Sequence, residues 1–410
     1  MSPNTEEWLG MREKINKLYE KYKEEYKIYS KNQQKLKTLE EKFEKDNKTC
    51  DVKYKILSLN SSDEIKKILY HKYNRLKELE ISDGQEYVKL KRWIDSALKL
   101  PFKKKNFTTF LQNVSEQLDN ELYGMKDVKQ QILLFLNNRL LSPEQAGCSL
   151  GLIGPPGVGK TTIAKCISKV LDWPFQQISF GGVNEPEFLK GHDFTYVGSQ
   201  AGEIAKCMQR MKYSNGIMFF DEYEKISDNK NITSLLLHVT DFQQNSEFQD
   251  NYLSNIKIDL SKLWFIYSMN SLPKDSALRD RIYKIEIPAY KMDEKIEILI
   301  RHVLPKILKK INLKKDEITI SKENAKYFID RIDKGEAGIR NIEQNTKNLI
   351  NKLSFLLHHQ NKKGKIKGFD SISFNIDKKL KLPLEIDKDV IDKLCKSKET
   401  KNPSLEMMYM

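Results

Sequence analysis

The sequence predicts an α/β fold with a doubly wound parallel sheet, preceded by an α-helical region and followed by a small, mainly helical domain. Short apolar segments bounded by turns alternate with longer amphipathic stretches, which is typical of a parallel sheet covered by helices on both faces. The segments expected to form its strands are Ser149–Ile153, Phe175–Phe180, Gly216–Phe220, Leu263–Met269 and Tyr283–Ile287.

Composition narrows the class of protein. Of the 410 residues, 39% are hydrophobic and 31% are charged, as in a soluble globular protein. No run of about 18 apolar residues occurs, and the N-terminus lacks the apolar segment of a secretory signal, so no membrane partner is expected. Five scattered cysteines, none in a CxxC pair, favour a reducing compartment such as the cytoplasm.

The net charge of +14 has two interpretations. Lysine-rich clusters could contact the phosphates of DNA. Alternatively, the lysines reflect a general abundance of Lys, Asn and Ile, which is typical of an AT-rich coding sequence. Such a sequence would suit an AT-rich microbe or a large-genome virus. A viral protein would lie in the host cytoplasm or the virion. Composition alone does not establish nucleic-acid binding. The clusters are Lys103–Lys105, Lys309–Lys315, Lys362–Lys367 and Lys378–Lys381.

The regions around the predicted sheet are expected to be helical. Apolar side chains recur at three- and four-residue steps over residues 8–46, which predicts one long polar helix with a coiled-coil or bundle stripe. The stripe fits a partner helix and packing on its own domain equally well. Further helices are expected at Ser62–Glu80 and at Glu86–Lys99, which ends before Pro101.

The domain boundaries follow from these changes of pattern. A helix at Lys126–Leu141 leads into the predicted sheet, and after Pro288 the chain becomes mainly helical again, with short strands expected near Ser371–Asn375 and Leu382–Ile386. The expected parts are an N-terminal helical region at 1–106, the α/β domain at 107–288, a helical lid at 289–397 and a polar tail at 398–410.

A glycine-rich turn between a predicted strand and a predicted helix matches the GxxxxGK[ST] pattern of a phosphate-binding P-loop. Glycines let backbone N–H groups converge on phosphates, and the following helix N-terminus adds its positive dipole. Lys160 is expected to contact the β- and γ-phosphates of ATP, and Thr161 to ligate Mg²⁺. The residues of this turn are Gly154, Pro155, Pro156, Gly157, Val158, Gly159, Lys160, Thr161 and Thr162.

A second apolar strand ends in the carboxylates Asp221 and Glu222. Seen alone, the pair would be an ordinary solvated turn. Its position after a P-loop favours a Walker B arrangement, in which Asp221 holds Mg²⁺ and Glu222 acts as general base on the attacking water.

Other positions are ambiguous on their own. Asn270 follows a core strand and fits either a water-orienting role, known as sensor 1, or a turn cap. Arg279 and Arg281 precede the last strand, where an arginine finger can reach a neighbouring subunit's nucleotide. Spacing does not decide between them. Arg340, in the predicted lid, is either another cation of the site or a surface charge.

With these motifs in order, the chain resembles the ATPase portion of Lon, an AAA+ protease, from about Glu86 to Lys393. The resemblance implies an AAA+ P-loop NTPase fold and a homo-oligomeric, hexameric ring. Besides the P-loop, the matches include Leu122-Tyr123-Gly124-Met125, Ile178-Ser179-Phe180-Gly181-Gly182-Val183, Thr195-Tyr196-Val197-Gly198, Ile285-Glu286-Ile287-Pro288 and Glu336-Ala337-Gly338-Ile339-Arg340-Asn341.

The resemblance also implies roles for single residues. Tyr123 and Val128 would line the adenine pocket. Asn270 would be sensor 1, Arg340 sensor 2, and Arg281, rather than Arg279, the finger that acts across subunits.

Two further positions would lie on the first pore loop. Tyr196 and Val197 would grip an extended polypeptide substrate in the central channel. The segment Ile226–Ile232 looks shorter and less glycine-rich than the corresponding loop of Lon, which puts a second pore loop and processive threading in question.

The chain also departs from Lon after the lid. Only Ser397–Met410 remain there, and no glycine-rich motif carries a serine nucleophile, so proteolysis by this chain alone is not expected. The leading hypothesis is an ATP-driven machine that unfolds, translocates or remodels proteins. The alternatives are a DNA-associated ATPase, a nucleotide-dependent assembly protein, and the motor subunit of a split protease with a separate peptidase.

Overall fold

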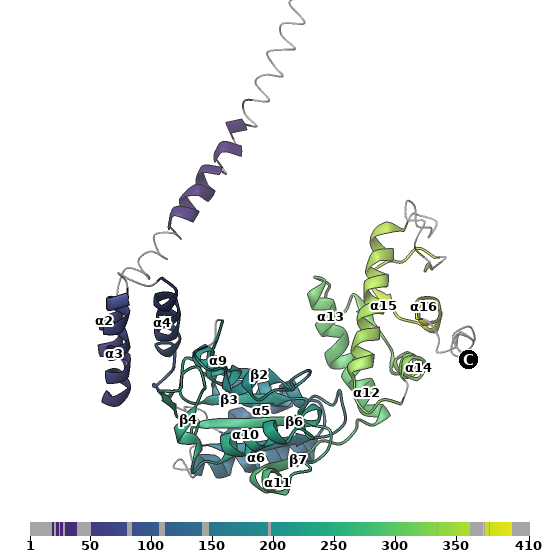
Figure 1. The fold of residues 1–410 in the computed structure, drawn as a ribbon. Coiled ribbons are helices and arrows are strands. Elements are labelled where there is room, and N and C mark those ends of the chain that lie inside the picture. The colour runs from purple at the N-terminus through teal and green to yellow at the C-terminus, as the bar shows by residue number, and fades with distance from the viewer. Residues whose placement is uncertain are drawn as a thin grey trace, which may run out of the picture. The chain divides into compact units, whose positions relative to one another are not determined.

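The computed structural model describes residues 51–79, 84–105, 111–141, 147–195, 198–333, 335–360, 372, 374–376 and 378–395, and residues 19, 22–23, 25–27 and 29–38 near the N-terminus. The chain divides into two compact units, Met1–Leu98 and Lys99–Met410 (Figure 1). The expected division of the second unit into a sheet domain and a lid, with its boundaries, stays a prediction.

The first unit is helical. Its helices are α2 (Val52–Leu57), α3 (Asp63–Leu79) and α4 (Gly84–Ala97), and its buried side chains include Leu69, Trp93 and Ile94. The described residues between 19 and 38 are helical and exposed, as expected for a polar rod. The rest of the predicted helix at 8–46 lies outside the described residues.

The second unit contains a five-stranded parallel sheet in the order β2-β3-β6-β1-β7. The doubly wound sheet predicted from the sequence is therefore confirmed. A separate antiparallel hairpin, β4 (Phe248–Gln249) and β5 (Lys257–Ile258), precedes β6. The strands of the main sheet are β1 (Cys148–Ile153), β2 (Phe175–Ser179), β3 (Gly216–Asp221), β6 (Leu263–Met269) and β7 (Tyr283–Glu286).

The three central strands β1, β3 and β6 are buried on both faces, which explains why they read as continuous apolar runs, whereas the edge strands β2 and β7 are partly exposed. Ile217 and Trp264 point into a core shared with helices α5, α6 and α7. On the opposite face, the ring of Phe220 stacks on Phe265 at 5.9 Å, and Tyr267 meets Tyr223 beyond the end of β3. The helices of this part are α5 (Leu111–Glu121), α6 (Lys126–Leu141), α7 (Lys160–Leu171), α8 (Glu187–Lys190), α9 (Glu203–Met211), α10 (Lys230–Thr240) and α11 (Ser276–Arg281), with 3-10 turns η1 (Tyr223–Lys225) and η2 (Asn245–Glu247).

After β7 the chain is mainly helical and has its own apolar core; we refer to this part as the lid. A short parallel pair, β8 (Ile318–Thr319) and β9 (Leu384–Glu385), borders it. Of the two strands expected here, the one at Leu382–Ile386 contains β9, but the described residues of Ser371–Asn375 are not in a strand. The helices are α12 (Met292–Ile298), the π-helical turn η3 (Leu299–Val303), α13 (Leu304–Lys310), α14 (Lys322–Ile332), α15 (Arg340–His359) and α16 (Lys388–Leu394).

The cysteines with a described position carry free thiols. Burial raises the pKa of Cys166 to about 11 and that of Cys207 to about 12, so both thiols stay protonated at neutral pH. Among the described residues, no helix combines the length and apolar character needed to span a bilayer.

A buried ion pair fixes the segment that leads into α15. Lys295 Nζ lies 2.6 Å from Asp333 Oδ2, with the two side chains 7% and 9% exposed, and it also donates to the carbonyl of Glu336. Oδ1 of Asp333 accepts the N–H groups of Gly335 and Glu336. Burial acts to raise the pKa of Asp333, but the Lys295 and backbone hydrogen bonds prevail and lower it.

We predict that Lys295→Met destabilises the lid by about 3–5 kcal/mol, because it leaves a buried carboxylate without its cation. Chemical denaturation at neutral pH measures the change. The depressed pKa means that the pair stabilises the folded state above the ordinary aspartate pKa and that this contribution fades as the pH falls through the folded value. The deficit of the variant should therefore shrink below about pH 4.

The matched control is Lys306→Met, which breaks an exposed pair with Glu343 whose side chains are 61% and 43% exposed. Exposed pairs contribute about 0–1 kcal/mol. Equal losses in the two variants would contradict the structural role assigned to Lys295.

Candidate functional site

The site forms at one edge of the parallel sheet. Strands β3, β6 and β1 are neighbours, so their carboxyl ends lie together. In open α/β sheets this is the edge where ligands bind. It brings together Lys160 after β1, Asp221 and Glu222 at the end of β3, and Asn270 after β6.

The glycine-rich turn has the backbone of a phosphate cradle. Gly157 and Gly159 adopt φ values of 79° and 96°, a left-handed conformation that favours glycine. A Cβ on Gly154 would lie 2.3 Å from the carbonyl oxygen of Ile287. Pro155 and Pro156 continue the turn, Val158 is buried in the core, and Thr161 and Thr162 lie in the first turn of α7. This geometry fits a nucleotide phosphate at the N-terminus of α7.

Lys160 connects the cradle to the next strand of the sheet. Its side chain is only 8% exposed. Nζ donates to the carbonyls of Gly154 and Pro155 and to Oδ1 of Asn270, at 2.5, 3.2 and 2.9 Å. Burial lowers the pKa of Lys160, while the charges of Glu224 and Asp221 act to raise it. The contact with Asn270 joins residues that are 110 positions apart.

Glu224 is a member of the site that the sequence did not single out. Its Oε1 accepts a hydrogen bond from Asn270 Nδ2 at 2.5 Å, and its Oε2 is buried without a partner among the described residues. Because lysine only donates and a carboxylate only accepts, the Asn270 amide must turn its oxygen toward Lys160 and its nitrogen toward Glu224. The available signal was a third acid two positions after Glu222, on η1.

The paired carboxylates of β3 differ in their surroundings. Asp221 accepts hydrogen bonds from Gln177 Nε2 at 2.9 Å and from the backbone N–H of Glu222 at 3.1 Å. Glu222 has a left-handed backbone, with φ of 60°, and lies exposed beside Ser179. A Cβ on Gly181 would come within 2.6 Å of its carboxylate. Glu222 thus reaches the edge of the sheet, where a general base is expected.

Thr161 and Asp221 are suited to Mg²⁺. Magnesium is usually held by one or two protein oxygens together with substrate phosphates. In the described residues, no group of three or more His, Cys, Asp or Glu side chains forms a metal cage. The donors present therefore fit a magnesium ion that is bound jointly with the nucleotide.

A cavity of about 350 Å³ lies between the P-loop and the lid. Tyr123, which the sequence assigns to an adenine pocket, lines this cavity together with His302 on the π-helical turn, 6.1 Å away between ring centroids. Burial and the nearby cations Arg301 and Lys129 lower the pKa of His302, so the imidazole is neutral at pH 7. Val128, the other residue expected at the adenine pocket, is buried in the apolar core between the sheet and helices α5, α6 and α7.

The lid touches the P-loop through backbone atoms. The N–H of Ile339 donates to the carbonyl of Gly157 at 3.1 Å, and a Cβ on Gly338 would lie 2.4 Å from the carbonyl carbon of Gly157. Only glycine fits at 338 without displacing the loop. Arg340, the first residue of α15, is exposed, and its Cβ is within 3.3 Å of where a Cβ on Gly157 would lie. This places the predicted sensor 2 arginine beside the phosphate cradle.

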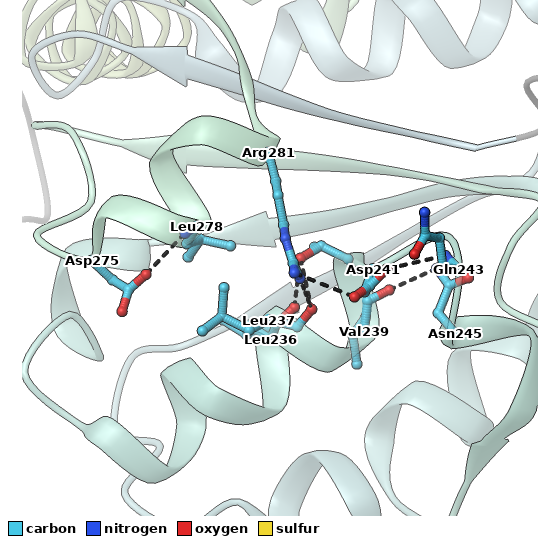
Figure 2. Close-up of polar contacts among 10 residues, drawn as sticks. Leu236, Leu237, Val239, Asp241, Gln243, Asn245, Asp275, Leu278 and Arg281 are labelled. Carbon is cyan, nitrogen blue, oxygen red and sulfur yellow. Dashed lines mark hydrogen bonds and ion pairs between the residues drawn. The ribbon is translucent and has the colours of Figure 1, made fainter.

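The two candidate finger arginines differ in their contacts. Arg279 is half-buried and donates to the carbonyls of Pro273 and Lys274, so it braces its own loop. Arg281 points toward the end of α10, where Nη1 donates to Leu237 O at 2.5 Å and Nη2 lies 3.3 Å from Asp241 Oδ2 (Figure 2). Its side chain is 37% exposed.

The predicted pore-loop residues Tyr196 and Val197 lie outside the described residues. The two ends of their loop meet, since a Cβ on Gly202 would lie 2.5 Å from the N–H of Gly191. Asp250, in the β4–β5 connection, accepts the N–H of Gly202 at 2.7 Å. Burial raises the pKa of Asp250, and the hydrogen bonds from the backbone N–H groups of Gly202, Leu253 and Tyr252 partly oppose that shift.

Known proteins are similar to this chain in sequence. Residues 150–288 match the family model described as ATPase family associated with various cellular activities (AAA). The chain is 38% identical over 277 residues to the Lon protease of Halothermothrix orenii. It is 33% identical over 316 residues to a Lon protease homolog of Acanthamoeba polyphaga mimivirus, and 35% identical over 316 residues to Lon protease 1 of Syntrophotalea carbinolica.

These matches cover 67%, 72% and 75% of this chain but only 35%, 30% and 38% of the relatives. The chain thus spans about a third of their length. A solved structure of a RuvB mutant from Thermotoga maritima is similar with a TM-score of 0.40 and 19% identity, covering 59% of this chain and 67% of that one, a likeness too distant to add to the assignment. The motifs, the sheet order and the relatives agree: the chain belongs to the Lon-family AAA+ ATPases.

Proposed function

We propose that this chain hydrolyses ATP to unfold, translocate or remodel polypeptides, as a homo-oligomeric, six-membered ring in a reducing compartment such as the cytoplasm. The observation that carries the proposal is the hydrogen bond between Lys160 Nζ and Asn270 Oδ1, at the sheet edge where Asp221 and Glu222 lie at the end of β3. It unites the phosphate-binding cation, the metal-binding acid, the general base and a water-orienting amide at one edge of the sheet.

The chemistry follows from these positions. Backbone N–H groups of the P-loop and the Lys160 ammonium neutralise charge on the β- and γ-phosphates, while Glu222 accepts a proton from the attacking water. Magnesium, held by Thr161 and Asp221, supplies further charge neutralisation when bound. Arg340 contacts the phosphates from the lid.

Glu224 has a positioning role in this proposal. By accepting a hydrogen bond from Nδ2 of Asn270, it keeps the amide oxygen Oδ1 turned toward Lys160. That oxygen can accept a hydrogen bond from the attacking water. The carboxylate also balances the buried charge of Lys160.

The ring completes the site in the proposal. Arg281 of one subunit acts on the nucleotide of the next, and Tyr196 and Val197 contact the polypeptide. We also propose that these 410 residues supply the motor without peptide-bond cleavage. A DNA partner is the second candidate, motivated by the net charge of +14, and a separate peptidase is a further possible partner.

We predict that the purified chain hydrolyses ATP and that casein, as an unfolded polypeptide, increases the rate. Glu222→Gln should abolish hydrolysis while retaining ATP binding, because it removes the base and leaves the cradle intact. Phosphate release measures turnover, and fluorescent nucleotide measures binding. Release of peptides from casein would contradict the absence of proteolysis. Stimulation by duplex DNA but not by casein would favour the second candidate.

We further predict that Glu224→Gln lowers kcat by roughly 10-fold or more, as expected for loss of orientation of a catalytic group. Since the Glu224 charge acts to raise the pKa of Lys160, its removal should also shift the alkaline limb of the pH–rate profile to lower pH. Glu247→Gln, which removes a surface carboxylate paired with Lys257, is the control. An unchanged kcat and pH profile in Glu224→Gln would exclude the positioning role.

A further inference from the structure

The end of α10 carries an aspartate where a helix favours a cation. Asp241 is the C-cap residue of α10. The last carbonyl groups of a helix lack intrahelical partners and form the negative end of its dipole, so a carboxylate there is locally unfavourable. Residues that break a local rule and are stabilised by other contacts are often found at functional sites.

Asp241 is held in place by the turn that follows it. Its Oδ1 accepts the N–H of Gln243 at 3.1 Å, and its backbone carbonyl accepts the N–H groups of Gln244 and Asn245 at 3.0 and 2.8 Å. Asn245 in turn donates its amide to the carbonyl of Val239 at 2.8 Å (Figure 2). The turn therefore fixes Oδ1, and Oδ2 remains to meet Arg281.

The C-terminal end of α10 holds the guanidinium of Arg281 but engages only some of its hydrogen-bond donors. Its two contacts are the carbonyl of Leu237 and Oδ2 of Asp241, which combine a helix C-terminal carbonyl with an ion pair. A guanidinium has five N–H donors, so these contacts employ only part of its capacity. Donors held in place before the reaction stabilise developing charge better than donors that must first be ordered.

We infer that Asp241 is a positioning residue for Arg281: together with the Leu237 carbonyl, it fixes the guanidinium at the C-terminal end of α10 so that the remaining donors reach the nucleotide of a neighbouring subunit. The inference rests on the proposed ATPase function and on the proposed role of Arg281. Asp241 itself touches neither nucleotide nor water in this scheme and acts only through Arg281.

The test compares ATP hydrolysis by full-length Asp241→Asn, Arg281→Ala and the double variant. Asparagine keeps an oxygen for the N–H of Gln243 but removes the charge that pairs with Arg281. We expect Asp241→Asn to lower kcat by roughly 10- to 100-fold, a part of the 10³–10⁵ that an arginine finger contributes. The KM for ATP should stay within about twofold, because the finger acts on the transition state. The double variant should match Arg281→Ala alone.

Asp259→Asn is the matched control, since Asp259 is another turn aspartate that accepts a backbone N–H, from Ser261, and pairs with Lys262 at 2.7 Å. It should leave kcat unchanged. A higher kcat in Asp241→Asn would identify Asp241 as a restraint on Arg281 and overturn the inference. An additional loss on top of Arg281→Ala would overturn it too, because Asp241 would then act through another group.

Mixed rings separate a positioning role from damage to the subunit's own site. Glu222→Gln subunits keep Arg281 and should restore hydrolysis to Arg281→Ala subunits, which keep Glu222. Subunits with both Glu222→Gln and Asp241→Asn should restore it roughly 10- to 100-fold less well, in line with the loss expected for Asp241→Asn alone. Full restoration by them would contradict the inference. If the unmodified chain hydrolyses no ATP, the proposed function fails and the inference with it, whereas an active chain with additive variants removes the inference alone.

Discussion

The parallel pairing of β3, β6 and β1 is the constraint on which the rest of the second unit depends. It places three loops at one edge, so Lys160 and Asn270 meet although 110 residues separate them. Pairing over such sequence distances requires closure of long loops, an entropic cost that grows slowly with loop length. Burial of apolar side chains on both faces offsets it, which is why the core of the sheet and the geometry of the site are inseparable.

Many of the helices and strands were predictable because local sequence patterns, above all the spacing of apolar residues, define them. The helix Lys126–Leu141 and the strand Leu263–Met269 have the predicted bounds, since the hydrophobic pattern defines them. The two-residue strands β4, β5 and β8 escaped prediction, because a segment that short shows no alternation. The strand expected around Ser371–Asn375 was wrong where the structure describes it, since Ile372, Phe374 and Asn375 lie outside any strand. Apolar alternation in so short a segment does not by itself specify a strand.

The parts of the site that could not be predicted are those made by tertiary contact. Nothing in the spacing of Glu224 indicates that it bonds Asn270, and nothing around Arg279 and Arg281 indicates which one braces its own loop. His302 reaches the cavity beside Tyr123 only because a π-helical turn alters the register of its helix. Residue types indicate which chemistry a site can perform. Which side chains contact one another depends on how the tertiary fold brings distant parts of the chain together.

The glycine at 338 gives the lid a mechanical property. The backbone before α15 contacts the backbone of Gly157 in the phosphate loop directly, with no flexible side chain between them. A movement of the loop is therefore passed directly to the start of α15. The helix has 20 residues and therefore extends roughly 30 Å from that point. A rotation of about 10° at the P-loop would displace its far end by roughly 5 Å, given that length. A small rotation at the phosphate loop would thus become a displacement comparable to one turn of a helix at the outer end of the lid.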